Sequence, residues 1–194
     1  MVDGVELDLL AVETVLRAKG MRPFDVELLS THGGSLRLFC CHDAASHVET
    51  EALRDLRRAE HEAGLDRLET YGGFTARVQA VRERFLEFLA QARREGKTVA
   101  AYGAAAKGNT FLNYAGVGAS DIVAVFDANP HKQDRFLPGS HIPIYAPARV
   151  DEIRPDYLLI LPWNLREEII GQMARIREWG GRFVTVAPDP KVWD

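Results

Sequence analysis

The chain has 194 residues, 46% of them hydrophobic, so it can bury one good core or one core with a smaller attached lobe. Its formal charge of -4 argues against binding to nucleic acid or to an anionic membrane by general electrostatic attraction. No apolar run approaches the roughly 20 residues that span a bilayer, and the first residues lack the features of a signal peptide, so we expect a soluble, cytoplasmic protein.

The first stretch, residues 1–45, predicts a short α-β-β arrangement. Apolar residues at helical spacing over residues 9–16 predict an amphipathic helix that ends near Gly20. Two strands are predicted over residues 24–29 and 35–41, joined by a Thr-His-Gly-Gly turn. A helix and two strands are too little to fold independently, so we interpret this stretch as the trailing edge of a larger sheet.

The second stretch, residues 46–96, predicts a charged helical connector with a break near residues 71–73. After the break, apolar residues recur every three or four positions from Phe74 to Ala92, which indicates one apolar face of a long helix. Arginine and glutamate side chains are interspersed before the break, at Arg54, Arg57, Arg58, Glu60 and Glu62. We interpret these charges as a solvated helix face, although a partner-binding face would have the same pattern.

The third stretch, residues 97–194, alternates short apolar runs with helical segments. Buried strands are predicted at residues 98–102, 121–126, 156–161 and 182–186, with a further short strand at 141–145. Helices are predicted near residues 109–114 and 165–179. Strands that alternate with helices pair in parallel through right-handed crossovers, so we predict an α/β domain with a Rossmann-like, doubly wound, mostly parallel sheet. In such sheets, ligands bind at the carboxyl ends of the strands.

A strand, a loop of small residues and a helix follow one another from Val99 to Thr110. Small side chains let a ligand approach the backbone, the helix N-terminus offers N–H groups, and Lys107 adds positive charge, so the segment suits a phosphate or diphosphate. The pattern is neither GxGxxG nor a Walker A loop, and therefore predicts neither dinucleotide binding nor nucleotide hydrolysis. The same small residues would also let the helix pack tightly on the sheet, and spacing does not separate the two interpretations.

Two later loops carry further candidate ligand contacts. Asp127 follows the second strand, where Rossmann-type folds often bind a ribose hydroxyl, although Asp-Ala-Asn-Pro is also ordinary turn chemistry. His131 and Lys132 in the same loop face either a ligand phosphate or solvent. After the fourth strand, Trp163 either stacks on a base or packs on the core, and Asn164 is suited to cap the next helix.

The sequence shows no recognisable catalytic or metal-binding set. The six histidines have no HExxH spacing, the adjacent Cys40 and Cys41 have no CxxC partner, and no Gly-x-Ser-x-Gly elbow occurs. We therefore expect no catalytic residue, no metal site and no disulfide in this chain. His32, in the Thr-His-Gly-Gly turn, is the best single candidate for contact with a substrate, and capping of the turn explains it equally well.

Four ordered motifs in the third stretch resemble the C-terminal domain of sugar C-methyltransferases. They are Ala-Tyr-Gly-Ala-Ala-Ala-Lys-Gly-Asn-Thr at residues 101–110, Asp-x-Asn-Pro-x-Lys-Gln at 127–133, Leu-Pro-Gly-x-x-Ile-Pro at 137–143 and Leu-Ile-Leu-Pro-Trp-Asn-Leu at 159–165. The Phe-Asp-Val-Glu and Thr-His-Gly-Gly-Ser-Leu-Arg segments of the first stretch are similar to the last strands of that family's methyl-donor domain. The resemblance therefore covers nearly the whole chain.

The resemblance implies an enzyme larger than this chain. Members of the family carry a zinc module, a domain for S-adenosylmethionine and this C-terminal domain, and they methylate a carbon next to a ketone on a deoxythymidine-diphosphate (dTDP) sugar, after a base forms the enolate. This chain lacks the zinc cysteines, the glycine-rich donor loop and the family's Tyr-x-Glu-His motif. By resemblance, an N-terminal methyl-donor domain supplies them in cis or in trans, this chain binds no S-adenosylmethionine, and the fragment is inactive without that domain.

By the same resemblance, this chain is the sugar-nucleotide-binding portion of the enzyme. The residues expected to contact the dTDP-sugar are Lys107, Gly108, Asn109 and Thr110 at the diphosphate, with Asn113, His131, Lys132, Trp163, Asn164 and His32 as further contacts. Two alternatives remain open. The chain is either an independent Rossmann-like nucleotide-binding or oxidoreductase module, which a titration with NAD(H) would reveal, or a structural packing domain, whose melting temperature no nucleotide would change.

Overall fold

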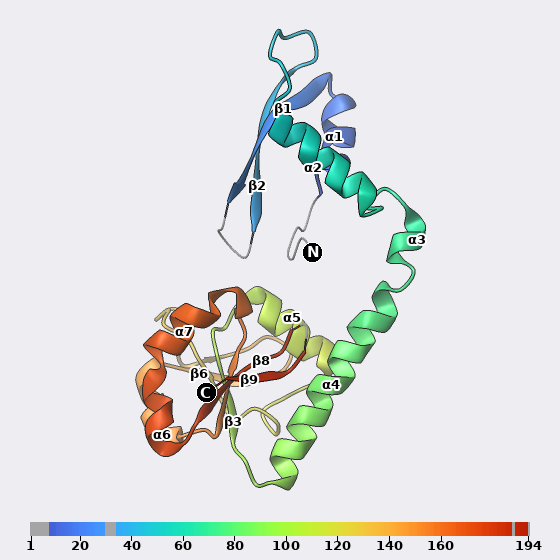
Figure 1. Ribbon diagram of the computed structural model, residues 1–194. Helices are drawn as coiled ribbons and strands as arrows, with labels where there is room; N and C mark the ends of the chain where they lie inside the picture. Colours follow the sequence, from blue (N-terminus) through green and yellow to red (C-terminus); the bar gives the residue numbers. More distant parts are fainter. Residues whose placement is uncertain (1–7, 30–33, 188, 194) are drawn as a thin grey trace. The chain divides into compact units, whose positions relative to one another are not determined.

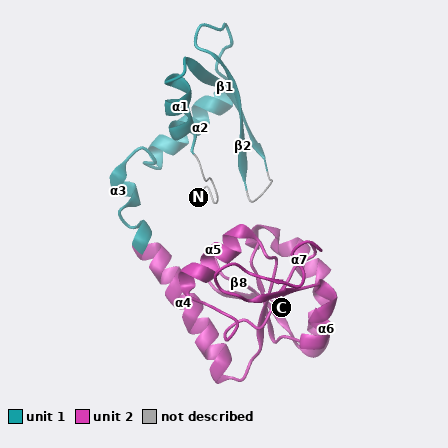
Figure 2. Cartoon of the chain, turned by 180° about the vertical axis from the view of Figure 1, so that it is seen from behind, with its two compact units in different colours: residues 1–75 teal, residues 76–194 magenta. Residues whose placement is uncertain are grey.

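The computed structural model describes residues 8–29, 34–187 and 189–193. The chain divides into two compact units, residues 1–75 and 76–194, which are described separately below (Figure 2). The segment predicted as a connector contributes helices to both units, and its standing as a separate domain stays a prediction.

The first unit contains the predicted α-β-β arrangement, followed by two helices. Its elements are α1 (Leu9–Arg17), β1 (Met21–Leu29), β2 (Ser35–His42), α2 (Glu51–Glu62) and α3 (Leu68–Tyr71). The two strands pair antiparallel, from Met21 opposite His42 to Leu29 opposite Ser35. A small core of Leu9, Val26 and Leu53 joins the two longer helices to the hairpin. The turn that holds His32 lies outside the described residues.

Charged side chains of α2 tie the first unit together. Both carboxylate oxygens of the buried Glu60 accept backbone N–H groups at the start of α1, from Leu9 at 2.9 Å and from Leu10 at 3.0 Å. Negative charge is favourable at a helix N-terminus, so Glu60 caps a helix that is remote in sequence. Arg57 bridges the buried Glu13 and the half-buried Glu49, and these hydrogen bonds raise the pKa of Arg57 above its ordinary value. Arg57 and Glu60 of α2 are therefore internal, whereas Arg54, Arg58 and Glu62 are exposed, so the interpretation of a solvated helix face is correct for part of the helix.

The helix α4 (Phe74–Arg94) follows the predicted break at residues 71–73 and crosses the boundary between the units. Its buried residues Phe85, Leu89 and Ala92 recur at spacings of three and four. They pack into the core of the second unit on one face of its sheet. The apolar periodicity of the sequence is confirmed here.

The described part of the second unit contains one seven-stranded sheet in the order β5-β6-β4-β3-β7-β8-β9. Its strands lie between helices (Figure 1). The strands are β3 (Val99–Tyr102), β4 (Val125–Phe126), β5 (Arg135–Phe136), β6 (Pro143–Tyr145), β7 (Tyr157–Ile160), β8 (Arg182–Thr185) and β9 (Lys191–Trp193). The five central strands pair in parallel, and short antiparallel strands close both edges. The chain runs outward from β3 in both directions, through β4 to β6 and through β7 to β8. This order confirms the Rossmann-like fold and puts the topological switch point between β3 and β7.

Helices cover both faces of this sheet. The helix α5 (Ala106–Ala115) packs with α4 on one face, where Phe85 and Leu112 are buried. The short helices α6 (Val150–Ile153) and α7 (Arg166–Gln172), with the 3-10 turn η4 (Ala174–Trp179), cover the other face. The remaining 3-10 turns are η2 (Pro147–Arg149) and η3 (Trp163–Leu165). The single helix predicted near residues 165–179 is therefore three short segments.

The strands differ from the sequence prediction in three places. Only Val125 and Phe126 of the predicted strand at 121–126 are regular, although the N–H of Val123 still donates to the carbonyl of Val99 at 2.9 Å. The edge strands β5 and β9 were not predicted. Runs of two and three residues are too short to show a period, and they are defined by pairing with β6 and β8 instead.

Candidate functional site

The loops after β3 and β7 meet at the switch point, and two glycines allow them to touch. Gly103 has a φ of +86°, and a Cβ there would lie 2.5 Å from the Cδ of Pro162. A Cβ on Gly108 would lie 2.6 Å from the Cβ of Leu161. Real Cβ atoms do not approach other carbons this closely, so both positions require glycine for packing. For Gly108, predicted as a ligand contact, the structure shows close packing of α5 against the loop after β7.

Three of the predicted site residues converge on this crevice. The Nζ of Lys107, in the first turn of α5, donates a hydrogen bond to the Oδ1 of Asn164 and lies 4.6 Å from the ring centroid of Trp163. Asn164 belongs to the 3-10 turn η3, and the N-cap position of α7 is Leu165. The prediction that Asn164 caps the following helix was therefore wrong, because its amide oxygen reaches across the crevice to Lys107 instead.

The helix α5 begins without a side-chain cap. Its N-cap residue is Ala105, which has no side-chain acceptor, and the first turn holds no acidic residue. The first N–H groups of a helix have no partner within the helix, and they carry partial positive charge. The positive end of α5 and the Lys107 ammonium therefore lie together at the carboxyl end of β3.

Asp127 and Lys132 form a second cluster, which braces the loop after β3. The buried Asp127 carboxylate accepts the N–H of Ala104 at 2.7 Å, the N–H of Asn129 at 2.8 Å and the Nζ of Lys132 at 3.2 Å. Lys132 also donates to the carbonyl oxygen of Ala104 at 2.9 Å. The hydrogen bond from Asn129 is the turn chemistry that the sequence suggested, and because a carboxylate has about four acceptor positions, the three donors leave room for a ribose hydroxyl as a fourth.

The other predicted site residues are spread over the second unit. Asn113 is exposed, and its Nδ2 donates to the carbonyl oxygens of Asn109 and Pro138, both at 2.9 Å, which ties α5 to the loop before β6. The Oδ1 of Asn109 is buried and accepts no hydrogen bond from the described residues. Thr110 and His131 are exposed.

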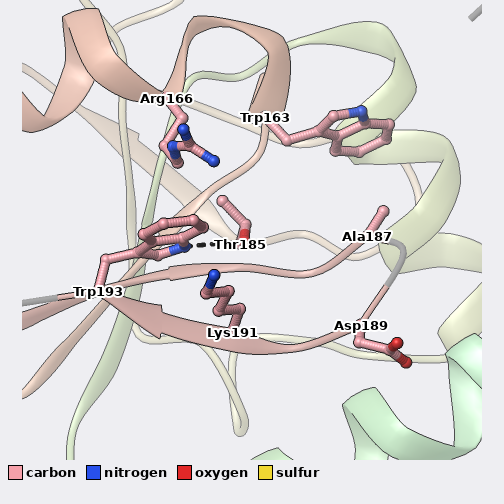
Figure 3. A pocket seen from close by; sticks show the side chains of 7 residues that line it. All are labelled: Trp163, Arg166, Thr185, Ala187, Asp189, Lys191 and Trp193. Atoms are coloured by element: carbon pink, nitrogen blue, oxygen red, sulfur yellow. Dashed lines mark hydrogen bonds between the residues drawn. The ribbon is translucent and has the colours of Figure 1, made fainter. Parts of the chain in front are cut away.

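A cavity of about 390 Å³ opens beside this crevice, at the carboxyl end of β8 (Figure 3). Trp163 is common to the crevice and the cavity. The residues that line the cavity are Trp163, Arg166, Thr185, Ala187, Asp189, Lys191 and Trp193. Sequence reasoning missed all of these except Trp163, because several of them come from β9 and the loop before it. A strand of three residues is too short to show the alternating pattern by which a strand is recognised in a sequence.

A titratable side chain, that of Tyr102, lies at the end of the first strand of this sheet. Tyr102, at the end of β3, is buried and donates its hydroxyl hydrogen to the Oε1 of Gln172 at 3.2 Å. Burial, helped by the nearby charges of Asp127 and Glu168, raises the pKa of Tyr102, which keeps the phenol protonated at neutral pH. Within the described ranges, no three His, Cys, Asp or Glu side chains are grouped to hold a metal ion. No described helix is long and apolar enough to cross a membrane.

Comparison with known proteins points to one family. Residues 30–188 match the family model described as the C-methyltransferase C-terminal domain. The chain is also 37% identical over 179 residues to the C-methyltransferase NovU of Streptomyces niveus. That alignment covers 92% of this chain and 43% of the relative, so the chain spans less than half of the relative's length.

Proposed function

The chain belongs to the family of C-methyltransferase C-terminal domains, and on this premise we propose that it is the sugar-nucleotide-binding portion of an S-adenosylmethionine-dependent C-methyltransferase. The substrate we propose is a dTDP-linked keto-deoxysugar. The observation that carries the proposal is the meeting of Lys107, Trp163 and Asn164 at the switch point of a Rossmann-like sheet. Ligands of open α/β sheets bind at this point.

The diphosphate would bind at the start of α5. The uncapped N–H groups of the first turn suit an anion, and an ammonium group adds a charge-assisted hydrogen bond. Lys107 is held by the amide oxygen of Asn164, so part of its side-chain entropy is already lost before a ligand arrives. The packing of Gly103 and Gly108 supports this role, because it fixes the distance between the two loops.

We propose that the methyl donor and the base that forms the enolate are supplied by another part of the enzyme, in cis or in trans. The chain covers 43% of its relative, which leaves room for such a part. In this proposal the chain binds no S-adenosylmethionine, and Asp127, the acidic residue after the second strand, braces the loop after β3 through two backbone N–H groups and Lys132. We therefore assign no step of methyl transfer to this chain, whose role is to bind and orient the sugar nucleotide.

Isothermal titration calorimetry with thymidine diphosphate tests the assignment. We expect binding by the unaltered chain, and a loss of roughly 1.5–3 kcal/mol in Lys107→Ala, the value of one charge-assisted hydrogen bond. Lys97→Ala is the matched control, because Lys97 precedes the amino end of β3, opposite the end where the ligand is proposed to bind, and pairs there with Asp156. Absence of heat with the unaltered chain, or equal affinity in Lys107→Ala, contradicts the proposal.

The same preparation distinguishes the two other functions. Binding of NAD(H) in a fluorescence titration, with no response to thymidine diphosphate, would favour an independent oxidoreductase module. A melting temperature that neither ligand changes would favour a packing role, because a ligand that binds the folded state stabilises it.

A further inference from the structure

We propose that the cavity lined by Trp163, Arg166, Thr185, Lys191 and Trp193 is a subsite for the planar, aromatic end of the anionic ligand. This inference rests on the proposed function, which places the diphosphate at the start of α5. It puts the ring of the ligand on the β7–β8 side of the crevice, away from Asp127.

The cavity has one indole wall whose orientation is fixed. Figure 3 shows the Trp193 ring between Arg166 and Lys191. The Arg166 guanidinium carbon and the Lys191 Nζ each lie 4.0 Å from the centroid of this ring. The Nε1 of Trp193 donates to the Oγ1 of Thr185 at 3.0 Å. Two cations and a hydrogen bond therefore hold the ring, which lowers the entropy lost when a ligand packs against it.

The charges around the cavity favour a ligand that is negative as well as aromatic. Asp189 forms an ion pair with Arg84, and Arg166 forms one with Glu167. Among the residues that the structure describes, no carboxylate forms an ion pair with Lys191, whose ammonium lines the cavity. Because Arg166 and Lys191 lie against the Trp193 ring, a planar ligand ring would pack beside these cations, against the edge of the Trp193 indole and against Trp163. The Lys191 ammonium would attract the anionic chain attached to that ring.

On the opposite side of the crevice, the acidic group is already used in contacts within the chain. In dinucleotide-binding sheets, the acidic residue after the second strand holds a ribose, but here Asp127 is engaged by Ala104, Asn129 and Lys132. Gln133 also donates to the carbonyl oxygen of Asp127 at 3.0 Å. On the β8 side, the cavity of about 390 Å³ lies within the roughly 300–1,000 Å³ of small-molecule sites.

Trp163 connects the two parts of the site. One contact of its ring is with the Lys107 ammonium, at 4.6 Å from the centroid, and the ring also lines the cavity. A ligand with its anion at the start of α5 can therefore continue past Trp163 towards Trp193. In this arrangement the anion lies at β3 and the ring lies at β8. A ring beside Asp127 would instead lie on the other side of β3, after β4.

The test compares three probes in calorimetry: thymidine diphosphate, thymidine and inorganic pyrophosphate. Trp193→Leu removes the indole, and Trp179→Leu is the matched control, because Trp179 also donates its Nε1 to an oxygen, that of Pro155, but does not line the cavity. We expect Trp193→Leu to weaken thymidine diphosphate about tenfold or more, to abolish thymidine binding, and to leave pyrophosphate within about twofold. Trp179→Leu should change none of the three.

Other outcomes overturn the inference separately from the proposed function. If Lys107→Ala weakens thymidine diphosphate but Trp193→Leu does not, the subsite is wrong and the diphosphate site stands. An equal loss for pyrophosphate and thymidine diphosphate in Trp193→Leu would also overturn it, because the indole would then support the anion. If the unaltered chain binds neither diphosphate, the proposed function fails, and the subsite with it.

A second pair of variants covers the case in which Trp193→Leu does not fold. Arg166 and Arg154 each lie over a tryptophan ring, at 4.0 Å from Trp193 and at 5.9 Å from Trp179, and Arg166 lines the cavity. We expect Arg166→Ala to weaken thymidine diphosphate severalfold and Arg154→Ala to leave it unchanged. Equal affinities in these two variants would contradict the subsite.

Discussion

Gly103 provides a direct test of how closely the two loops of the crevice approach each other. A Cβ at this position would lie 2.5 Å from the Cδ and 2.7 Å from the Cγ of Pro162. Gly116, which ends α5, has a similar φ of +75°, but nothing lies within 4 Å of a Cβ added there. Gly103→Ala and Gly116→Ala therefore share the backbone penalty and differ in the contact with the proline ring.

The expected magnitudes follow from these two contributions. An alanine in the left-handed region costs about 1–2 kcal/mol. An overpacked contact with a rigid ring adds about 1–3 kcal/mol, because the ring has no other rotamer to adopt. We expect Gly116→Ala to lower the free energy of unfolding by about 1–2 kcal/mol and Gly103→Ala by about 2–5 kcal/mol. For a unit of this size, each kcal/mol corresponds to roughly 3–6 °C in melting temperature.

Denaturant unfolding monitored by tryptophan fluorescence measures the free energy of unfolding of the second unit in both variants. The three tryptophans, Trp163, Trp179 and Trp193, all belong to the second unit, so the signal reports the unfolding of that unit. An equal loss of stability in the two variants would refute the reasoning. It would mean that the loops after β3 and β7 are not in contact and that the crevice is wider than described.

Three further predictions concern the charged groups. Asp127→Asn should lower the free energy of unfolding by about 1–2 kcal/mol, measured by thermal melts, because one of its partly buried donors loses its acceptor. An unchanged melting temperature would contradict the bracing of the loop. Burial raises the pKa of Asp156, but hydrogen bonds from Lys97 and the backbone outweigh it, so the net pKa is lowered. The ionised carboxylate therefore stabilises the fold above about pH 4, and this stabilisation is lost as the pH falls through the lowered pKa. In thermal melts, the difference in melting temperature between the unaltered chain and Asp156→Asn should shrink in that range, and a constant difference would contradict a role of Asp156 in the pH dependence. Arg57→Ala leaves the buried Glu13 of α1 with the exposed Arg17 as its remaining ion-pair partner, and should cost about 1–3 kcal/mol by far-UV circular dichroism. Arg58→Ala breaks an exposed pair and should cost less than about 1 kcal/mol, so equal effects would contradict the internal role of Arg57.

Local patterns were sufficient to predict the centre of the second unit. Strands β3 and β7 are continuous apolar runs, because parallel strands are buried on both faces, and β8 has three buried residues after the exposed Arg182. The helix α4 repeats its buried residues at helical spacing, and the break before it was also predicted. The edge strands β5 and β9 could not be predicted, because each is defined by a partner strand and not by its own sequence pattern.

The candidate site was predictable only in part, for a similar reason. Lys107 and Trp163 stand out because they follow buried strands at the edge where ligands bind. The role of Asn164 was assigned wrongly, because a 3-10 turn delays the start of α7 to Arg166. The cavity was missed altogether, since Trp193 meets Arg166 only through the pairing of β9 with β8.

The strand β9 serves the molecule in two ways at once. Its pairing covers the backbone of β8, and its Trp193 and Lys191 line the cavity. Deletion of residues 191–193 would expose the N–H and C=O groups of a buried-type apolar strand, a template on which a second molecule can add its own strand. Truncation here would therefore cause aggregation together with any loss of ligand affinity, and the two effects should be separated by light scattering before such a variant is used to judge binding.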